Sequence, residues 1–85
     1  MANKQVSVRD SFFDPEDVTI KKGETVEWTN EGSQDHTVTA AGLFDEVLKA
    51  GSKPFSYKFD KVGTVNYRCR FHSASHQMKG TVTVT

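Results

Sequence analysis

The chain lacks the cross-links and long apolar segments that stabilise or anchor many small domains. Cys69 is the only cysteine among 85 residues, which excludes a disulfide within the chain. No apolar run approaches the roughly 20 residues that span a bilayer, and the first residues contain no apolar segment typical of a signal peptide. We therefore expect one soluble domain, residues 1–85, with no membrane insertion in this chain.

The chain also has no excess of charge of either sign. Eleven basic residues balance eleven acidic ones, which argues against nucleic acid as a partner. The distribution is uneven, because residues 1–46 hold ten of the acidic residues and residues 47–85 hold seven of the basic ones. A domain of this length buries only roughly 60 to 65% of its unfolded surface. Without a disulfide, a bound metal is the candidate stabiliser of this thin core.

Short segments that alternate between apolar and polar residues dominate the sequence, as expected for half-buried strands. They lie at 5–8, 18–20, 25–29, 36–39, 55–59, 64–69 and 81–84, with turn-forming residues between them. The segment 41–49 does not alternate, and we expect a crossover loop there with at most one short helical turn near 43–49. The pattern predicts an all-β sandwich or barrel of about seven to eight short strands.

Donor atoms suited to a soft metal gather near the end of the chain. Cys69 offers a thiolate, His72 and His76 offer imidazoles, and Met78 offers a thioether. Two histidines, one cysteine and a weak axial methionine form the blue-copper electron-transfer site. The remaining histidine, His36, lies 33 residues before Cys69 in a predicted strand.

Strand alternation directs two of these donors toward the same core. Cys69 continues the inward parity of Tyr67, and His36 shares a face with Val38. Taken singly, a cysteine is more often a small buried hydrophobic residue than a ligand. The donors occur together on strand ends that can meet at one pole of a sandwich, and this combination favours a metal site.

Two stretches of the sequence resemble the cupredoxins, the plastocyanin-like and azurin-like group of small blue copper proteins. The first runs over 13–30 and continues at His36-Thr37-Val38; the second covers 63–72 and 78–84. The resemblance implies a Greek-key β-sandwich that binds one copper ion and carries single electrons between redox partners. It also implies a periplasmic or other extracytoplasmic compartment. Because the chain lacks a signal segment, we expect a mature domain excised from its signal or anchor. The cytoplasm is the alternative compartment.

The resemblance assigns four ligands to a copper ion that cycles between Cu(I) and Cu(II): His36, Cys69, His72 and Met78. His72 stands three residues after Cys69, as in plastocyanin-like loops, although its distance from Met78 is longer than theirs. The spacing from Cys69 to Met78 is azurin-like, but Ala74 occupies the azurin-like histidine position. His76 fits neither pattern and is the alternative to His72 as the second imidazole.

The resemblance also creates expectations for the residues around the ligands. Many cupredoxins place asparagine after the upstream histidine, whereas this chain has Thr37, so we expect fewer bonds to the cysteine loop. Backbone amides that follow Cys69 are the expected donors to its sulfur, since outer partners orient ligands and tune the metal. Phe71, Ala74 and Phe44 are candidates for an apolar rim where a redox partner docks.

Four protein donors leave no open coordination position for a substrate. We therefore expect a monomeric electron carrier that is not an enzyme and meets redox partner proteins through a small transient interface. A copper chaperone or storage module is the main alternative, which His76 beside Met78 would suit. Zinc could occupy the cysteine and histidines in purified protein. A metal-free immunoglobulin-like interaction domain would keep the sandwich without the metal.

Overall fold

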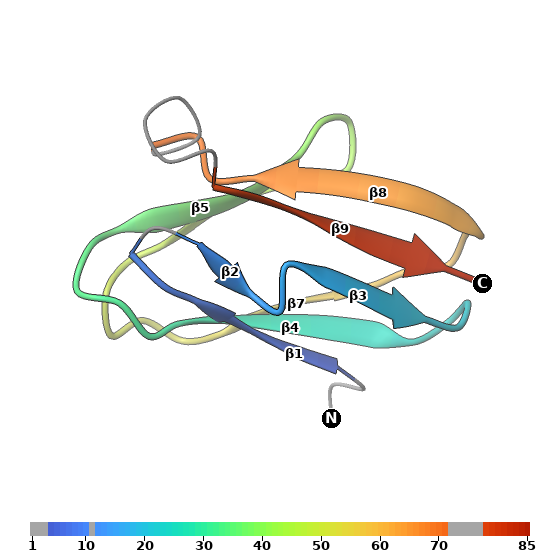
Figure 1. The fold of residues 1–85 in the computed structure, drawn as a ribbon, viewed down its shortest axis with the longest axis horizontal. Coiled ribbons are helices and arrows are strands. Elements are labelled where there is room, and N and C mark those ends of the chain that lie inside the picture. The colour runs from blue at the N-terminus through green and yellow to red at the C-terminus, as the bar shows by residue number, and fades with distance from the viewer. Residues whose placement is uncertain (1–3, 11, 72–77) are drawn as a thin grey trace.

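The computed structural model describes residues 4–10, 12–71 and 78–85, and this part of the chain forms nine strands in two sheets (Figure 1). The strands are β1 (Lys4–Val8), β2 (Phe13–Asp14), β3 (Asp17–Ile20), β4 (Thr25–Asn30), β5 (His36–Ala40), β6 (Phe44–Leu48), β7 (Phe55–Lys58), β8 (Gly63–Arg68) and β9 (Lys79–Val84). The described residues contain no helix, and hence none that could cross a membrane. The predicted all-β sandwich is confirmed.

The two sheets are mixed, and the chain passes repeatedly from one to the other. One sheet has the strand order β2-β1-β4-β7 and the other has the order β3-β9-β8-β5-β6. The pairs β1–β4 and β3–β9 are parallel, whereas the other paired strands are antiparallel. The two strands of each parallel pair are not consecutive in the chain, because β2 and β3 lie between β1 and β4, and five strands lie between β3 and β9. The pairing therefore brings segments far apart in the sequence side by side.

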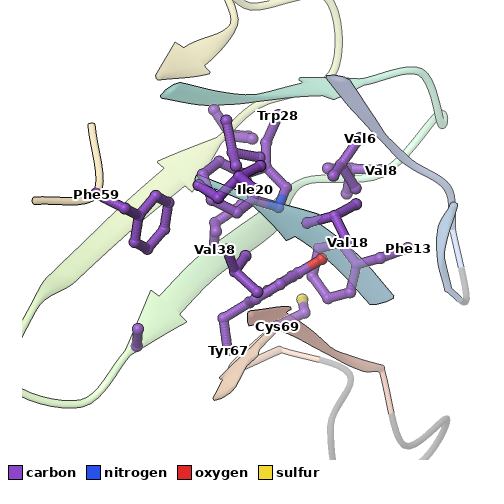
Figure 2. Close-up of a cluster of buried hydrophobic side chains, with 14 of the residues drawn as sticks. Val6, Val8, Phe13, Val18, Ile20, Trp28, Val38, Phe59, Tyr67 and Cys69 are labelled. Carbon is purple, nitrogen blue, oxygen red and sulfur yellow. The ribbon is translucent and has the colours of Figure 1, made fainter. Parts of the chain in front are cut away.

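The core lies between the sheets. Most of its side chains are those that the alternation in the sequence predicted to face inward. Trp28 is fully buried, with its ring centroid 5.2 Å from that of Tyr67 and 5.7 Å from that of Phe55. Aromatic pairs at these separations add about 0.5–1.5 kcal/mol beyond the burial of their area. Figure 2 shows Cys69 beside the same cluster of buried side chains as Tyr67 and Val38.

The segment 44–48 differs from the sequence-based expectation, because it is strand β6 and not a crossover loop with a helical turn. It pairs antiparallel with β5 along its whole length, from His36 opposite Leu48 to Ala40 opposite Phe44. β6 forms the edge of its sheet, and its three central side chains are exposed. An edge strand needs no alternation of apolar residues, which is why the sequence pattern did not predict it.

Close packing between β8 and β9 requires a glycine at position 80. Gly80 pairs with Tyr67, and a Cβ atom added at Gly80 would collide with the Tyr67 ring and lie 2.7 Å from the Glu16 carbonyl oxygen. The absence of a side chain therefore lets β9 approach both neighbours. This pairing also fixes the residues that flank the two strands, Cys69 after β8 and Met78 before β9.

Candidate metal centre

The β8–β9 ladder brings Cys69 and Met78 together. Cys69 directly follows β8 and Met78 directly precedes β9. The Cys69 amide donates to the Met78 carbonyl oxygen over 3.0 Å, which extends the antiparallel pairing by one step. Both side chains are buried, with exposed fractions of 0% and 1%. The thiol and the thioether thus belong to neighbouring backbone positions at one end of the sandwich.

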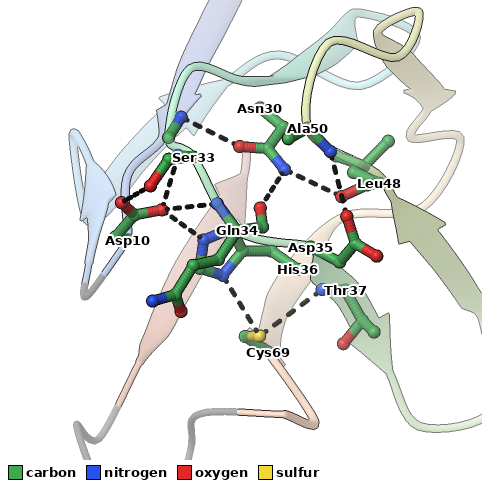
Figure 3. A network of polar contacts seen from close by, with 11 residues as sticks. Asp10, Asn30, Ser33, Gln34, Asp35, His36, Thr37, Leu48, Ala50 and Cys69 are labelled. Atoms are coloured by element: carbon green, nitrogen blue, oxygen red, sulfur yellow. Dashed lines mark hydrogen bonds and ion pairs between the residues drawn. The ribbon is translucent and has the colours of Figure 1, made fainter.

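His36 reaches the same end from β5. The pairing of Thr39 with Arg68 aligns β5 and β8, so that the start of β5 lies beside the end of β8. The His36 ring is fully buried, and its Nδ1 atom lies 3.7 Å from Cys69 Sγ (Figure 3). The expectation that strand parity directs His36 and Cys69 to one pole of the sandwich is confirmed.

The separation of these two donors fits a shared metal ion. Bonds of about 2.0 Å to nitrogen and about 2.3 Å to sulfur, the lengths seen for zinc, let two donors share one ion only within about 4.3 Å. His36 Nδ1 and Cys69 Sγ meet this condition. The set of buried imidazole, thiol and nearby thioether is soft, which suits copper better than the hard cations calcium or magnesium.

Thr37 connects β5 to the cysteine in two ways. Its backbone amide donates to Cys69 Sγ over 3.4 Å, and its hydroxyl oxygen accepts from the Arg70 amide over 2.7 Å. We expected the backbone amides that follow Cys69 to donate to its sulfur. For Arg70 this expectation is wrong, because its amide donates to Thr37 Oγ1 instead. The donor that the structure places on the sulfur comes from the neighbouring strand.

A chain of polar contacts extends from Thr37 and returns to Arg70. Thr39 Oγ1 lies 3.1 Å from Thr37 Oγ1 and donates to Asp45 Oδ1 over 2.8 Å, and Arg70 Nε donates to the same oxygen over 2.9 Å. The Thr39 hydroxyl, followed by Arg70, holds the pKa of Asp45 below its ordinary value. These contacts tie the cysteine loop to β5 and β6 beyond what Thr37 does alone.

Asp10 contacts His36 on the side away from Cys69, and no sequence pattern indicated this contact. Asp10 Oδ1 lies 3.2 Å from His36 Nε2, although the residues are 26 positions apart. The parallel pairing of β1 with β4, up to Val8 opposite Asn30, brings the segment after β1 beside the segment that leads into β5. No local pattern identifies such a contact, because it depends on the pairing of two strands.

The Asp10 carboxylate is held by several donors in addition to the imidazole. Its Oδ1 atom accepts from the amides of Ser33 and Gln34 over 2.9 and 3.1 Å, and its Oδ2 atom accepts from Ser33 Oγ over 2.9 Å. The hydrogen bond with His36, followed by those with Ser33 and Gln34, lowers the pKa of Asp10 to about 2. Asp10 is therefore ionised at neutral pH.

Three expected residues lie outside the described part of the chain: His72, Ala74 and His76. Phe71 is half exposed and stands two residues after Cys69, in keeping with the expected apolar rim. Phe44 does not belong to that rim. It pairs with Ala40 at the opposite end of β5 from His36, and its ring centroid lies 5.6 Å from that of Trp28.

Comparisons with known proteins agree with this architecture. Residues 2–84 match the family model described as a cupredoxin-like domain. Plastocyanin from Scenedesmus fuscus is 37% identical over 84 residues, with 85% of each chain covered. The solved structure of a purple cupredoxin from Nitrosopumilus maritimus has a TM-score of 0.85 and 27% identity, over 98% of this chain and all of the other. Oxidised plastocyanin from Dryopteris crassirhizoma has a TM-score of 0.82 and 28% identity, over 95% and 99%.

Proposed function

Because the chain belongs to the cupredoxin-like family, we propose that it is a type 1 (blue) copper protein that carries single electrons between redox partner proteins. The observation that carries this proposal is the 3.7 Å separation of two buried donors, His36 Nδ1 and Cys69 Sγ. The buried Met78 lies at the neighbouring backbone position. Copper bound by these residues would supply a one-electron couple between Cu(I) and Cu(II).

We assign His36, Cys69 and Met78 as three of the four ligands. Within 4–10, 12–71 and 78–85, no three or more histidine, cysteine, aspartate or glutamate side chains are grouped to hold a metal. The other two histidines of the chain are His72 and His76, so we propose that a second imidazole comes from the segment between Phe71 and Met78. His72 is our choice because it follows Cys69 by three residues, and His76 is the alternative.

The scaffold holds the described donors in place and keeps water away from them. His36 and Cys69 are each fully buried, and both are attached to paired strands. The Thr37 amide donates to the sulfur and thereby helps to fix its position. Ligands fixed in this way need little rearrangement when the charge of the site changes. Four protein donors also leave no position for a substrate, so we assign electron transfer and no enzymatic reaction.

The exposed side chain of Phe71, close to Cys69 in the sequence, is our candidate for the surface that redox partner proteins contact. Phe71 exposes about half of its surface, and the Arg70 guanidinium carbon lies 5.8 Å from its ring centroid. An exposed aromatic side chain near the site suits a small, short-lived interface, as expected of an electron carrier. We propose that the protein acts as a monomer in an extracytoplasmic compartment.

A titration of the apoprotein with Cu(II), followed in the visible spectrum, tests this function. The parent should develop an intense thiolate-to-copper band that saturates at one equivalent, and Cys69→Ser should not. Val65→Ala, a change on the strand that leads to Cys69, leaves the donors intact and should keep the band. Absence of the band from the folded parent would refute the proposal.

A further inference from the structure

The two nitrogen atoms of His36 face partners of different chemistry. Nε2 lies 3.2 Å from a carboxylate oxygen of Asp10, whereas Nδ1 lies 3.7 Å from Cys69 Sγ (Figure 3). An ionised carboxylate can only accept hydrogen bonds, and a neutral imidazole carries its proton on one nitrogen. The proton therefore belongs on Nε2. This leaves the lone pair of Nδ1 directed toward the sulfur.

The position of the Asp10 carboxylate is fixed by the loop that precedes His36. Successive amides of Ser33 and Gln34 converge on Oδ1, an arrangement of the kind that binds anions in proteins. Gly32 permits this approach, because a Cβ atom there would collide with Asp10 Oδ1 and lie 2.9 Å from Asp10 Cγ. The loop is thus shaped around the carboxylate.

A buried asparagine holds this loop in turn. Asn30 Nδ2 donates to the carbonyl oxygens of Gln34 and Leu48, each over 2.8 Å, and Asn30 Oδ1 accepts from the Gly32 amide over 2.9 Å. Leu48 is the residue of β6 that pairs with His36. The loop that holds the carboxylate and the imidazole that it contacts are therefore both attached to the β5–β6 pair.

From these contacts we propose that Asp10 is the positioning residue of the metal site: it holds the Nε2 proton of His36 and so presents Nδ1 as the ligand atom. The tautomer of the His36 ring is a property of the apoprotein. The consequence for redox chemistry rests on the function proposed above. A carboxylate partner makes an imidazole a more basic ligand, which favours the more highly charged Cu(II) and lowers the reduction potential.

Nuclear magnetic resonance of the apoprotein tests the tautomer of His36 without copper. Long-range proton–nitrogen correlations at pH 8 should show His36 as the Nε2–H tautomer in the parent. Asp10→Ala should populate the Nδ1–H tautomer. Asp35→Asn is the matched control, since Asp35 Oδ1 accepts from the Ala50 amide, and it should keep the parental pattern. A parental Nδ1–H tautomer, or no change in folded Asp10→Ala, would overturn the proposal.

The copper-loaded protein tests the electronic role with a milder variant. Asp10→Asn keeps the size of the side chain and removes its charge. We expect it to shift the one-electron equilibrium about tenfold toward Cu(I), a rise in potential of about 59 mV. Asp35→Asn should leave the potential unchanged. An unchanged potential in Asp10→Asn would contradict the electronic role, whereas a parent without the copper band would refute the proposed function and leave the tautomer test standing.

Discussion

The backbone amide of Thr37 donates a hydrogen bond to Cys69 Sγ over 3.4 Å, joining β5 to the residue that follows β8. The hydroxyl of the same threonine accepts the amide proton of Arg70. One residue therefore contacts the cysteine sulfur and also satisfies the backbone next to it. Because Thr37 directly follows His36, the strand that supplies the imidazole also holds the thiol in position.

Replacement of Thr37 with valine should destabilise the apoprotein without removing the copper band. Thr37→Val keeps the backbone amide on the sulfur but deprives the part-buried Arg70 amide of its acceptor, which should cost about 0.5–1.5 kcal/mol. Urea unfolding measures the change. Thr64→Val, at an exposed position of β8, is the control. Equal stability of the two variants would show that the hydroxyl does not tie the loop.

The contribution of Asp45 should depend on pH in a defined direction. Its pKa is lowered in the folded protein by Thr39 and Arg70, so the carboxylate stabilises the fold at pH values above its unfolded value near 4. This contribution is lost as the pH falls through the lowered pKa. Asp45→Asn should be less stable than the parent at pH 7, and the difference should narrow in acid.

Thermal unfolding at a series of pH values measures the Asp45 effect. Glu46→Gln is the control, because it removes the neighbouring exposed carboxylate on β6. A constant difference between Asp45→Asn and the parent from pH 7 to pH 3 would mean that the charge of Asp45 is not the stabilising feature.

A methyl group at position 80 should destabilise the fold. Gly80→Ala places a Cβ atom against the Tyr67 ring and the Glu16 carbonyl oxygen, and overpacking of this kind costs about 1–3 kcal/mol. Tyr67→Phe removes one of the colliding atoms, so the double variant should lose less stability than the sum of the two changes. Denaturant unfolding of the apoproteins checks this. Gly80→Ala as stable as the parent would contradict the packing described.

The second imidazole can be identified by comparing two alanine variants. His72→Ala should abolish or strongly shift the thiolate-to-copper band, whereas His76→Ala should retain it, because His72 follows Cys69 by three residues, a spacing that lets a tight turn present both donors to one ion. Both proteins should show the parental far-ultraviolet circular dichroism. Loss of the band only in His76→Ala would transfer the assignment to His76.

The sequence predicted the features that depend on local periodicity. The alternation that buries Tyr67 continues to Cys69, and the alternation of β5 places His36 with Val38. These two side chains could therefore be assigned to one core before their distance was known. The seven alternating segments are all strands for the same reason.

Features that depend on pairing between distant strands could not be predicted. β6 is an edge strand defined by its ladder with β5, and its exposed centre carries no apolar alternation. Asp10 reaches His36 only because β1 lies parallel to β4. A single acidic residue among eleven gives no signal of such a contact in the sequence.

Voltammetry of the copper-loaded protein, combined with copper analysis after repeated redox cycles, tests the central claim most directly. A carrier should show one reversible one-electron wave and keep one copper per chain in both oxidation states, even with a Cu(I) chelator in solution. Cys69→Ser should lose the wave. Transfer of the copper to the chelator on reduction of the parent would contradict electron transfer and identify the protein as a copper donor.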